Sequence, residues 1–216
     1  MIGGLVLRIT ETILNTWIIM AVLIAFAIVV RVKIRRFKDI PRGFQNVVEY
    51  MVEAFDNFLR SAAGEKLMFL GNWFFMVFCF VLLSNISGLF FLRPPTADWA
   101  TNITLALVTF FLIHILGGKM RKTGYLKEFF KPNAVFLPIN LIGEIARPIS
   151  LSFRLFGNIL AGTILLGLIY KVVFLRYLVP APLHAFFDLF AGAIQTYVFC
   201  MLSFTYISGA TTVEEQ

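Results

Sequence analysis

The stretch AVFLPINLIGEIARPISLSFRLFGNILAGTILLGLIY, Ala134–Tyr170, is compatible with a helix along its whole length, and only Pro138 and Pro148 interrupt it. At 1.5 Å per residue a helix of this length is about 55 Å long, whereas the hydrocarbon core of a bilayer is about 30 Å thick. Such a helix must tilt steeply, kink or extend beyond the bilayer. A second over-long apolar segment, 182–208, follows the break at Pro180. Together the two segments predict a long, tilted helical hairpin.

Composition places the whole chain in a membrane. Of the 216 residues, 59% are hydrophobic and only 14% are charged, against about 45–50% and about 25% in an ordinary soluble domain. These values exclude disorder, a coiled coil and nearly every water-soluble enzyme. We expect an all-α polytopic membrane protein with a single membrane domain over 1–216, about five membrane-embedded helices and one amphipathic interfacial helix. The segments are a first span at 13–30, the interfacial helix at 44–60, a second span at 67–92, a third span at 102–117, and the hairpin helices at 134–170 and 182–208.

Basic residues concentrate in two loops and predict the orientation of the chain. The loop 31–42 holds six Lys or Arg residues, and the loop 119–131 holds five. Under the positive-inside rule both loops are cytoplasmic, which puts the N-terminus outside and the C-terminus in the cytoplasm. These two loops account for much of the net charge of +7, so we expect no nucleic-acid partner.

Ionisable side chains inside membrane helices are costly, and in this chain they concentrate on the two hairpin helices. At about 100° per residue, one face of the first hairpin helix carries Asn140, Glu144, Arg147, Arg154 and Asn158. One face of the last helix carries His184, Asp188, Gln195, Phe199 and Tyr206. Two polar faces on consecutive antiparallel helices suggest a path for ions across the membrane.

Structural explanations compete with this ion path for several of these residues. Glu144 and Arg147, three positions apart, also fit an ion pair that only neutralises two charges. His184 also fits an interfacial or capping group, and Gln195 an interhelical hydrogen bond. Arg154 differs, because no acidic residue lies three or four positions from it and a guanidinium group does not lose its proton. It therefore requires a counter-charge from another helix, another subunit or water.

The segment RPISLSFRLFGN, Arg147–Asn158, resembles the signature around the essential arginine in the a subunits of bacterial F-type ATP synthases. Further similar blocks follow the order of that family along nearly the whole chain: TILNTWIIM (12–20), PRGFQNVVE (41–49), SNISGL (84–89), ADWATNITL (97–105) and AIQTYVF (193–199). By this resemblance the chain is identified as a member of the family.

The resemblance implies a stationary subunit of the bacterial plasma membrane, whose tilted hairpin packs against a rotating ring of c subunits. Arg154 matches the arginine that faces the carboxylates of the ring. Gln195 matches its glutamine neighbour on the last helix, and Asn158 lies one turn from the arginine as in the family motif. The implied partners are the c-subunit ring, the b subunits of the peripheral stalk, the remaining ATP synthase subunits and the lipid bilayer.

The resemblance and the predicted orientation together suggest two half-channels. The outer half-channel is expected to use Asp188 and His184, and the inner one Glu144, Arg147 and Asn140. Many family members pair an acid and a histidine in the outer half-channel, one on each hairpin helix. Here the matching position on the first hairpin helix is Thr163, so His184, one turn before Asp188, is the candidate substitute.

The predicted function is translocation of an ion, expected to be a proton, through the stationary subunit of a rotary ATP synthase. The sequence contains no Gly-x-x-x-x-Gly-Lys-[Ser/Thr] motif and no cluster of metal ligands. We therefore expect no direct nucleotide binding, no cofactor, no metal and no independent catalytic site. The alternative is an independent secondary transporter or channel in which Arg154 binds an anion. Co-purification with a c-ring distinguishes the two.

Overall fold

A computed structural model describes residues 10–38, 40–90, 92–122, 124–125, 129–130, 133–172, 174 and 177–211. This part of the chain is helical and contains no β-strand. Five of its helical stretches are long and apolar enough to cross a membrane: Glu11–Lys33, Leu67–Phe90, Trp99–Arg121, Leu137–Lys171 and Pro180–Thr211. The predicted all-α polytopic fold is therefore confirmed. Lys127 and Lys131, two of the basic residues behind the predicted orientation, lie outside the described residues.

The helices follow one another with short connections. In chain order they are α1 (Glu11–Lys33), the 3-10 turn η1 (Ile34–Arg36), α2 (Phe44–Ala63), η2 (Glu65–Leu70), α3 (Gly71–Ile86), η3 (Ser87–Phe90), η4 (Pro95–Ala97), α4 (Trp99–Arg121), η5 (Ala134–Phe136), α6 (Leu137–Lys171), α7 (Pro180–His184), the π-helical η7 (Ala185–Ala191) and α8 (Gly192–Thr211). Each segment expected from the sequence overlaps one of these helices. The second membrane stretch is described as far as Phe90, and the two prolines that follow Arg93 disfavour helix at their own positions and at the preceding one.

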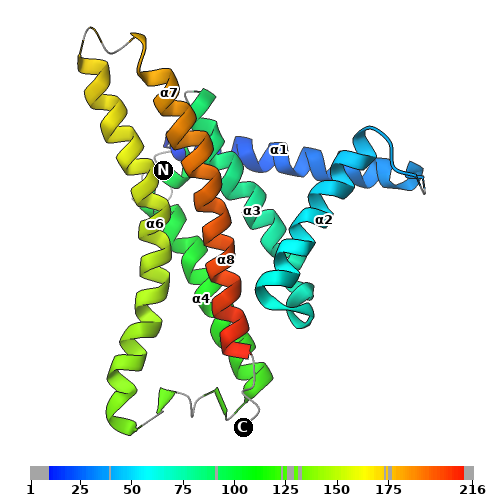
Figure 1. Ribbon diagram of the computed structural model, residues 1–216, viewed down its shortest axis with the longest axis vertical. Coiled ribbons are helices and arrows are strands. Elements are labelled where there is room, and N and C mark those ends of the chain that lie inside the picture. The colour runs from blue at the N-terminus through cyan, green and yellow to red at the C-terminus, as the bar shows by residue number, and fades with distance from the viewer. Residues whose placement is uncertain are drawn as a thin grey trace, which may run out of the picture.

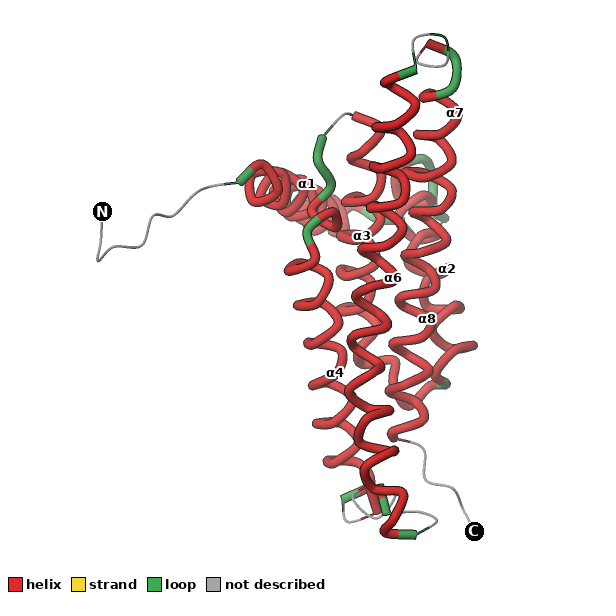
Figure 2. The backbone as a smooth tube through the Cα atoms, turned by 90° about the vertical axis from the view of Figure 1, so that its left-hand side faces the viewer, coloured by secondary structure: helices red, strands yellow, loops and turns green. Residues whose placement is uncertain are grey.

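The last two membrane stretches form an antiparallel hairpin along the long axis of the molecule (Figures 1 and 2). α6 has 35 residues and continues through Pro148, so it is about 52 Å long. α1 runs across this direction, since it is seen from the side in Figure 1 and nearly end-on in Figure 2. A bilayer that holds α1 upright therefore holds the hairpin strongly inclined, and this inclination accommodates the excess length of α6.

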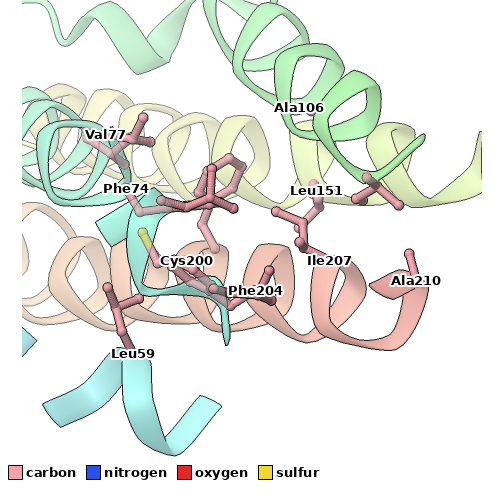
Figure 3. Packing of buried hydrophobic residues seen from close by; sticks show 14 of the residues in the cluster. Leu59, Phe74, Val77, Ala106, Leu151, Cys200, Phe204, Ile207 and Ala210 are labelled. Atoms are coloured by element: carbon pink, nitrogen blue, oxygen red, sulfur yellow. The ribbon is translucent and has the colours of Figure 1, made fainter. Parts of the chain in front are cut away.

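α8 lies at the centre of the packing and contacts α2, α3, α4 and α6. In Figure 3, Leu59 of α2 lies on one side of α8, and Phe74 of α3, Leu151 of α6 and Ala106 of α4 lie on the other. Phe74 stacks on Phe204 of α8 with 3.9 Å between the ring centroids, and both side chains are fully buried. The two cysteines of the chain are free thiols, as their places within apolar runs predict.

Gly192, where α8 begins, allows α3 to approach closely. A Cβ atom at this position would lie 2.8 Å from Cβ of Asn85. The Asn85 side-chain amide donates hydrogen bonds to the carbonyl oxygen of Gly192, 3.0 Å away, and to Oγ1 of Thr196, 3.2 Å away. Thr96 donates to the Asn85 side-chain oxygen at 2.9 Å. The contact between α3 and α8 thus depends on a glycine and on a buried hydrogen-bond network.

Gly192→Ala is expected to lower the free energy of unfolding by about 1–3 kcal/mol, because the added methyl group overpacks the Asn85 contact. The measurement is thermal unfolding of the purified chain in detergent, followed by circular dichroism. Gly209→Ala, on the same helix, is the control, since nothing lies within 4 Å of its added Cβ. Equal stability of the two variants would contradict the close approach of α3 and α8.

Candidate functional site

Three of the polar residues expected on one face of α6 line a single cavity. Its volume is about 570 Å³, and it opens between α6, α8 and the segment that carries Tyr125 and Phe129. Its lining residues are Tyr125, Phe129, Ile139, Asn140, Gly143, Glu144, Arg147, Thr205, Tyr206, Gly209 and Ala210. The regular spacing of α6 therefore gathers Asn140, Glu144 and Arg147, and α8 supplies the opposite wall.

Glu144 and Arg147 form an ion pair at the wall of this cavity. Nη1 of Arg147 lies 2.7 Å from Oε1 and 2.8 Å from Oε2 of Glu144. The guanidinium group also lies over the ring of Tyr206, 5.1 Å from its centroid, a distance at which a cation–π attraction operates. The structural ion pair suggested by the sequence is therefore present, and it borders a cavity of mixed polar and apolar lining that is large enough for water. Asn140 donates a hydrogen bond to the carbonyl oxygen of Phe129 at 2.8 Å.

A second polar group lies where α7 meets η7. Nδ1 of His184 is 2.7 Å from Oδ2 of Asp188, and Nε2 of the same ring is 3.4 Å from the hydroxyl oxygen of Tyr170, at the other side of the hairpin turn. Asp188 is buried. A Cβ atom at Gly88 would lie only 2.7 Å from the carboxyl carbon of Asp188, so this glycine makes room for the carboxylate.

The π-helical segment η7, Ala185–Ala191, contains Asp188 and leads into α8, which carries Gln195. A π-helix bonds residue i to residue i+5 and turns less per residue than an α-helix. The constant step of about 100°, which aligned His184 and Asp188 with Gln195 in the sequence, therefore does not hold across this segment. Short π segments within helices often occur at functional sites.

Arg154 lies on α6 between these two polar groups. It follows Glu144 by ten residues, about 15 Å along the helix axis, and precedes Tyr170 by sixteen, about 24 Å. Its side chain is exposed, and no carboxylate of the described chain lies within ion-pair distance of it. The counter-charge that the sequence requires is thus absent from the described part of this chain.

Asn158 and Gln195 carry buried amide nitrogens, and neither Nδ2 of Asn158 nor Nε2 of Gln195 finds an acceptor among the described residues. Within the same residues, no hydrogen bond joins Arg154 to Gln195. A buried amide group without a partner costs about 1–3 kcal/mol. Both groups therefore favour an acceptor from outside the described residues.

Sequence reasoning missed Tyr170 and Gly88. Tyr170 lies 14 residues from His184, across a turn whose geometry no helical spacing predicts. Gly88 lies in the SNISGL segment, which carried the family resemblance, but its contact with Asp188 joins two helices that are 100 residues apart in sequence. Thr163, at the position of the family's paired residue, donates to the carbonyl oxygen of Ile159 at 2.8 Å. His184, the candidate substitute, is the residue that contacts Asp188.

Comparison with known proteins gives a consistent result. The sequence pattern of the family described as "ATP synthase A chain" matches residues 13–208. The chain is 36% identical to "ATP synthase subunit a, sodium ion specific" of Propionigenium modestum, in an alignment that covers 94% of this chain and 74% of the relative. It is 34% identical to "ATP synthase subunit a" of Moorella thermoacetica, over 92% of this chain and 89% of the relative. It is also 34% identical to "ATP synthase subunit a" of Syntrophobacter fumaroxidans, over 90% of this chain and 82% of the relative.

Proposed function

Because this chain belongs to the ATP synthase A chain family, we propose that it is the stationary ion-translocating subunit of a rotary ATP synthase and that Arg154 faces the carboxylates of the c-subunit ring. Members of this family are multi-pass membrane components of the synthase and have no catalytic site of their own. The observation that carries the proposal is an exposed intramembrane arginine between two polar groups, with no carboxylate partner in the described chain.

In this proposal Arg154 causes a ring carboxylate opposite it to release its bound ion. A ring carboxylate that crosses lipid is neutral, because a bare charge in the bilayer is costly. Opposite the guanidinium group its ionised form is stabilised, so the bound ion leaves. The fixed positive charge also repels any cation that would otherwise pass directly between the two half-channels. The buried amide nitrogens of Asn158 and Gln195 are further donors that a ring carboxylate or water would satisfy.

We assign the outer half-channel to Asp188, His184 and Tyr170, and the inner one to the cavity lined by Asn140, Glu144 and Arg147. The outer group is compact and contains three titratable side chains in contact. The inner group borders about 570 Å³ of space, in which water reaches the carboxylate of Glu144 directly. The N-terminus is then outside the bacterial plasma membrane and the C-terminus in the cytoplasm, as the basic loops predict.

The c-subunit ring and the b subunits of the peripheral stalk are the proposed direct partners. The exposed face of α6 around Arg154 is the proposed surface for the ring. At about 100° per residue, Gly157, Ala161, Leu165 and Leu168 share this face of α6 with Arg154, and all four are exposed. An apolar face that carries one cation suits a ring of apolar helices that each carry one carboxylate.

The proposed ion is the proton. Imidazole, phenol and carboxylate groups exchange protons, and imidazole changes charge near neutral pH, so the contacts among Tyr170, His184 and Asp188 suit a proton relay. Sodium is the second candidate, because a relative that is 36% identical is named sodium ion specific.

Ion dependence of the reconstituted complex tests this assignment. ATP synthesis driven by a pH gradient and a potassium diffusion potential is expected to proceed at the same rate in medium freed of sodium and in medium with millimolar sodium. The control is the same vesicle preparation with a protonophore, which must stop synthesis. Synthesis that requires added sodium and continues with the protonophore would replace the proton by sodium. A purified chain that carries an anion in liposomes without a c-ring would contradict the proposed function itself.

A further inference from the structure

A second cavity lies away from the hairpin, in the angle between α1, α2 and α3. These three helices form the sides of a triangle in Figure 1, where α1 runs across the top, α2 returns from its far end and α3 closes the third side. The cavity has a volume of about 290 Å³. Its walls include Phe26 and Ala27 of α1, Met51 of α2, and Met76 and Cys79 of α3.

Arg31 is the one charged side chain in this lining. It is exposed, and no carboxylate of the described chain lies within ion-pair distance of it. Lys33 lies close by, with Nζ 4.6 Å from the centroid of the Phe44 ring at the start of α2. Arg35 and Lys38 continue the basic segment. The cavity thus combines apolar walls with one cation, Arg31, and a basic segment follows Arg31 in the chain.

α1, which forms one side of this cavity, is exposed over most of its length. α1 is the least buried of the membrane stretches, with only 11% of its apolar window inside the protein, and large side chains such as Phe26 and Ile28 are exposed. In a bilayer, an exposed apolar helix of this kind contacts acyl chains, and a basic end lies in the headgroup region. A cavity of this kind therefore meets acyl chains along its walls and phosphate groups at Arg31.

From this combination we infer that the cavity between α1, α2 and α3 binds one anionic phospholipid, with an acyl chain between the three helices and the phosphate at Arg31. Basic residues beside a membrane helix are each worth about 1 kcal/mol toward an anionic headgroup, which corresponds to about a fivefold preference. The acyl chain supplies packing that α1 lacks from the protein and so holds α1 and α2 in their angle.

A transmembrane helix of another subunit fits this cavity less well than an acyl chain. Packed helices lie about 8–10 Å apart, axis to axis, and an inserted helix would need this distance from three axes at once. The corner is already closed, because the rings of Phe26 on α1 and Phe44 on α2 lie 6.3 Å apart, centroid to centroid. A flexible acyl chain enters such a wedge without separating the helices.

The test uses the complete ATP synthase complex, purified in detergent and incubated with equal amounts of phosphatidylglycerol and phosphatidylcholine. Native mass spectrometry of the released chain is expected to show one retained phosphatidylglycerol, preferred about fivefold over phosphatidylcholine. Ala27→Trp fills the cavity and is expected to abolish retention. Ala25→Trp makes the same change two residues away, outside the lining, and is expected to leave retention unchanged.

Arg31→Gln is expected to remove the preference for phosphatidylglycerol while some lipid is still retained, whereas Arg35→Gln, outside the lining, keeps most of the preference. Equal retention in the Ala27→Trp and Ala25→Trp variants would overturn the inference, as would equal retention of the two lipids by the unaltered complex.

A photo-crosslinking residue, p-benzoylphenylalanine, in place of Met76 gives an independent result if Ala27→Trp does not assemble. A phospholipid adduct supports the site, and a peptide adduct from another subunit would show that a protein helix occupies it instead.

Discussion

Arg154→Ala is expected to abolish coupled ATP synthesis while the complex still assembles. Without the guanidinium group, no positive charge at this point of α6 stabilises the ionised ring carboxylate, and the neutral amide donors of Asn158 and Gln195 remain. A nearby opposite charge shifts such an ionisation equilibrium by about 10- to 1,000-fold, so ion release and coupled synthesis should fall by at least about tenfold. Loss of the fixed charge also removes the barrier between the half-channels, so passive ion leakage through the membrane sector should rise.

The measurement is ATP synthesis and passive proton uptake by proteoliposomes that contain the variant complex. Lys171→Ala is the matched control, because it removes an exposed cation from the last turn of the same helix without touching the proposed ion path. Subunit composition after purification separates a coupling defect from failed assembly. Near-normal synthesis by an assembled Arg154→Ala complex would disprove the proposed role of Arg154.

Asp188→Asn is expected to slow ion translocation far more than Glu144→Gln. Asp188 is 8% exposed and contacts His184 and Gly88. None of its contacts among the described residues is with another carboxyl group that could replace it. A positioned acid or base contributes about 10²–10⁴-fold to a proton transfer, and we expect a loss of about 10²-fold. Glu144 borders a cavity of about 570 Å³, in which water can replace a missing carboxylate, so Glu144→Gln should cost less than about tenfold.

Both variants are compared in the reconstituted complex by the rate of ATP synthesis under one fixed driving force. Glu53→Gln is the control, because Glu53 is exposed on α2, away from both half-channels. Similar small effects of Asp188→Asn and Glu144→Gln would leave the two assignments unsupported. A larger effect of Glu144→Gln would reverse the assignment of the tighter half-channel.

In the proposed outer half-channel, the contact between His184 and Asp188 takes the place of a paired residue on the other hairpin helix. The hydroxyl group of Thr163 is occupied by the carbonyl oxygen of Ile159 on its own helix. His184 instead reaches Asp188 from one turn away, at 2.7 Å, and Tyr170 supplies the contact from α6. A side-chain contact thus still connects the two hairpin helices at this level, but the imidazole comes from α7, on the same side of the hairpin as Asp188.

Regular helical spacing explains which parts of the site were predictable. Asn140, Glu144 and Arg147 lie on a continuous α-helix, so their common face follows from about 3.6 residues per turn, and the structure places them in one cavity. The lack of an acidic neighbour for Arg154 could also be recognised, because a partner on the same helix has to lie three or four residues away. The over-long hairpin followed from the length of an uninterrupted apolar run.

Sequence by itself determined the membrane environment, the number of spans, the length of the hairpin and the isolation of Arg154 within its own helix, because all of these depend on composition or on local periodicity. Only the tertiary structure decided the π-helical turn at Asp188, the space that Gly88 provides, the contact between Tyr170 and His184, and the cavity between α1, α2 and α3. These features join residues from different helices, and their geometry depends on how closely the helices approach. The spacing of residues along one helix does not specify that distance.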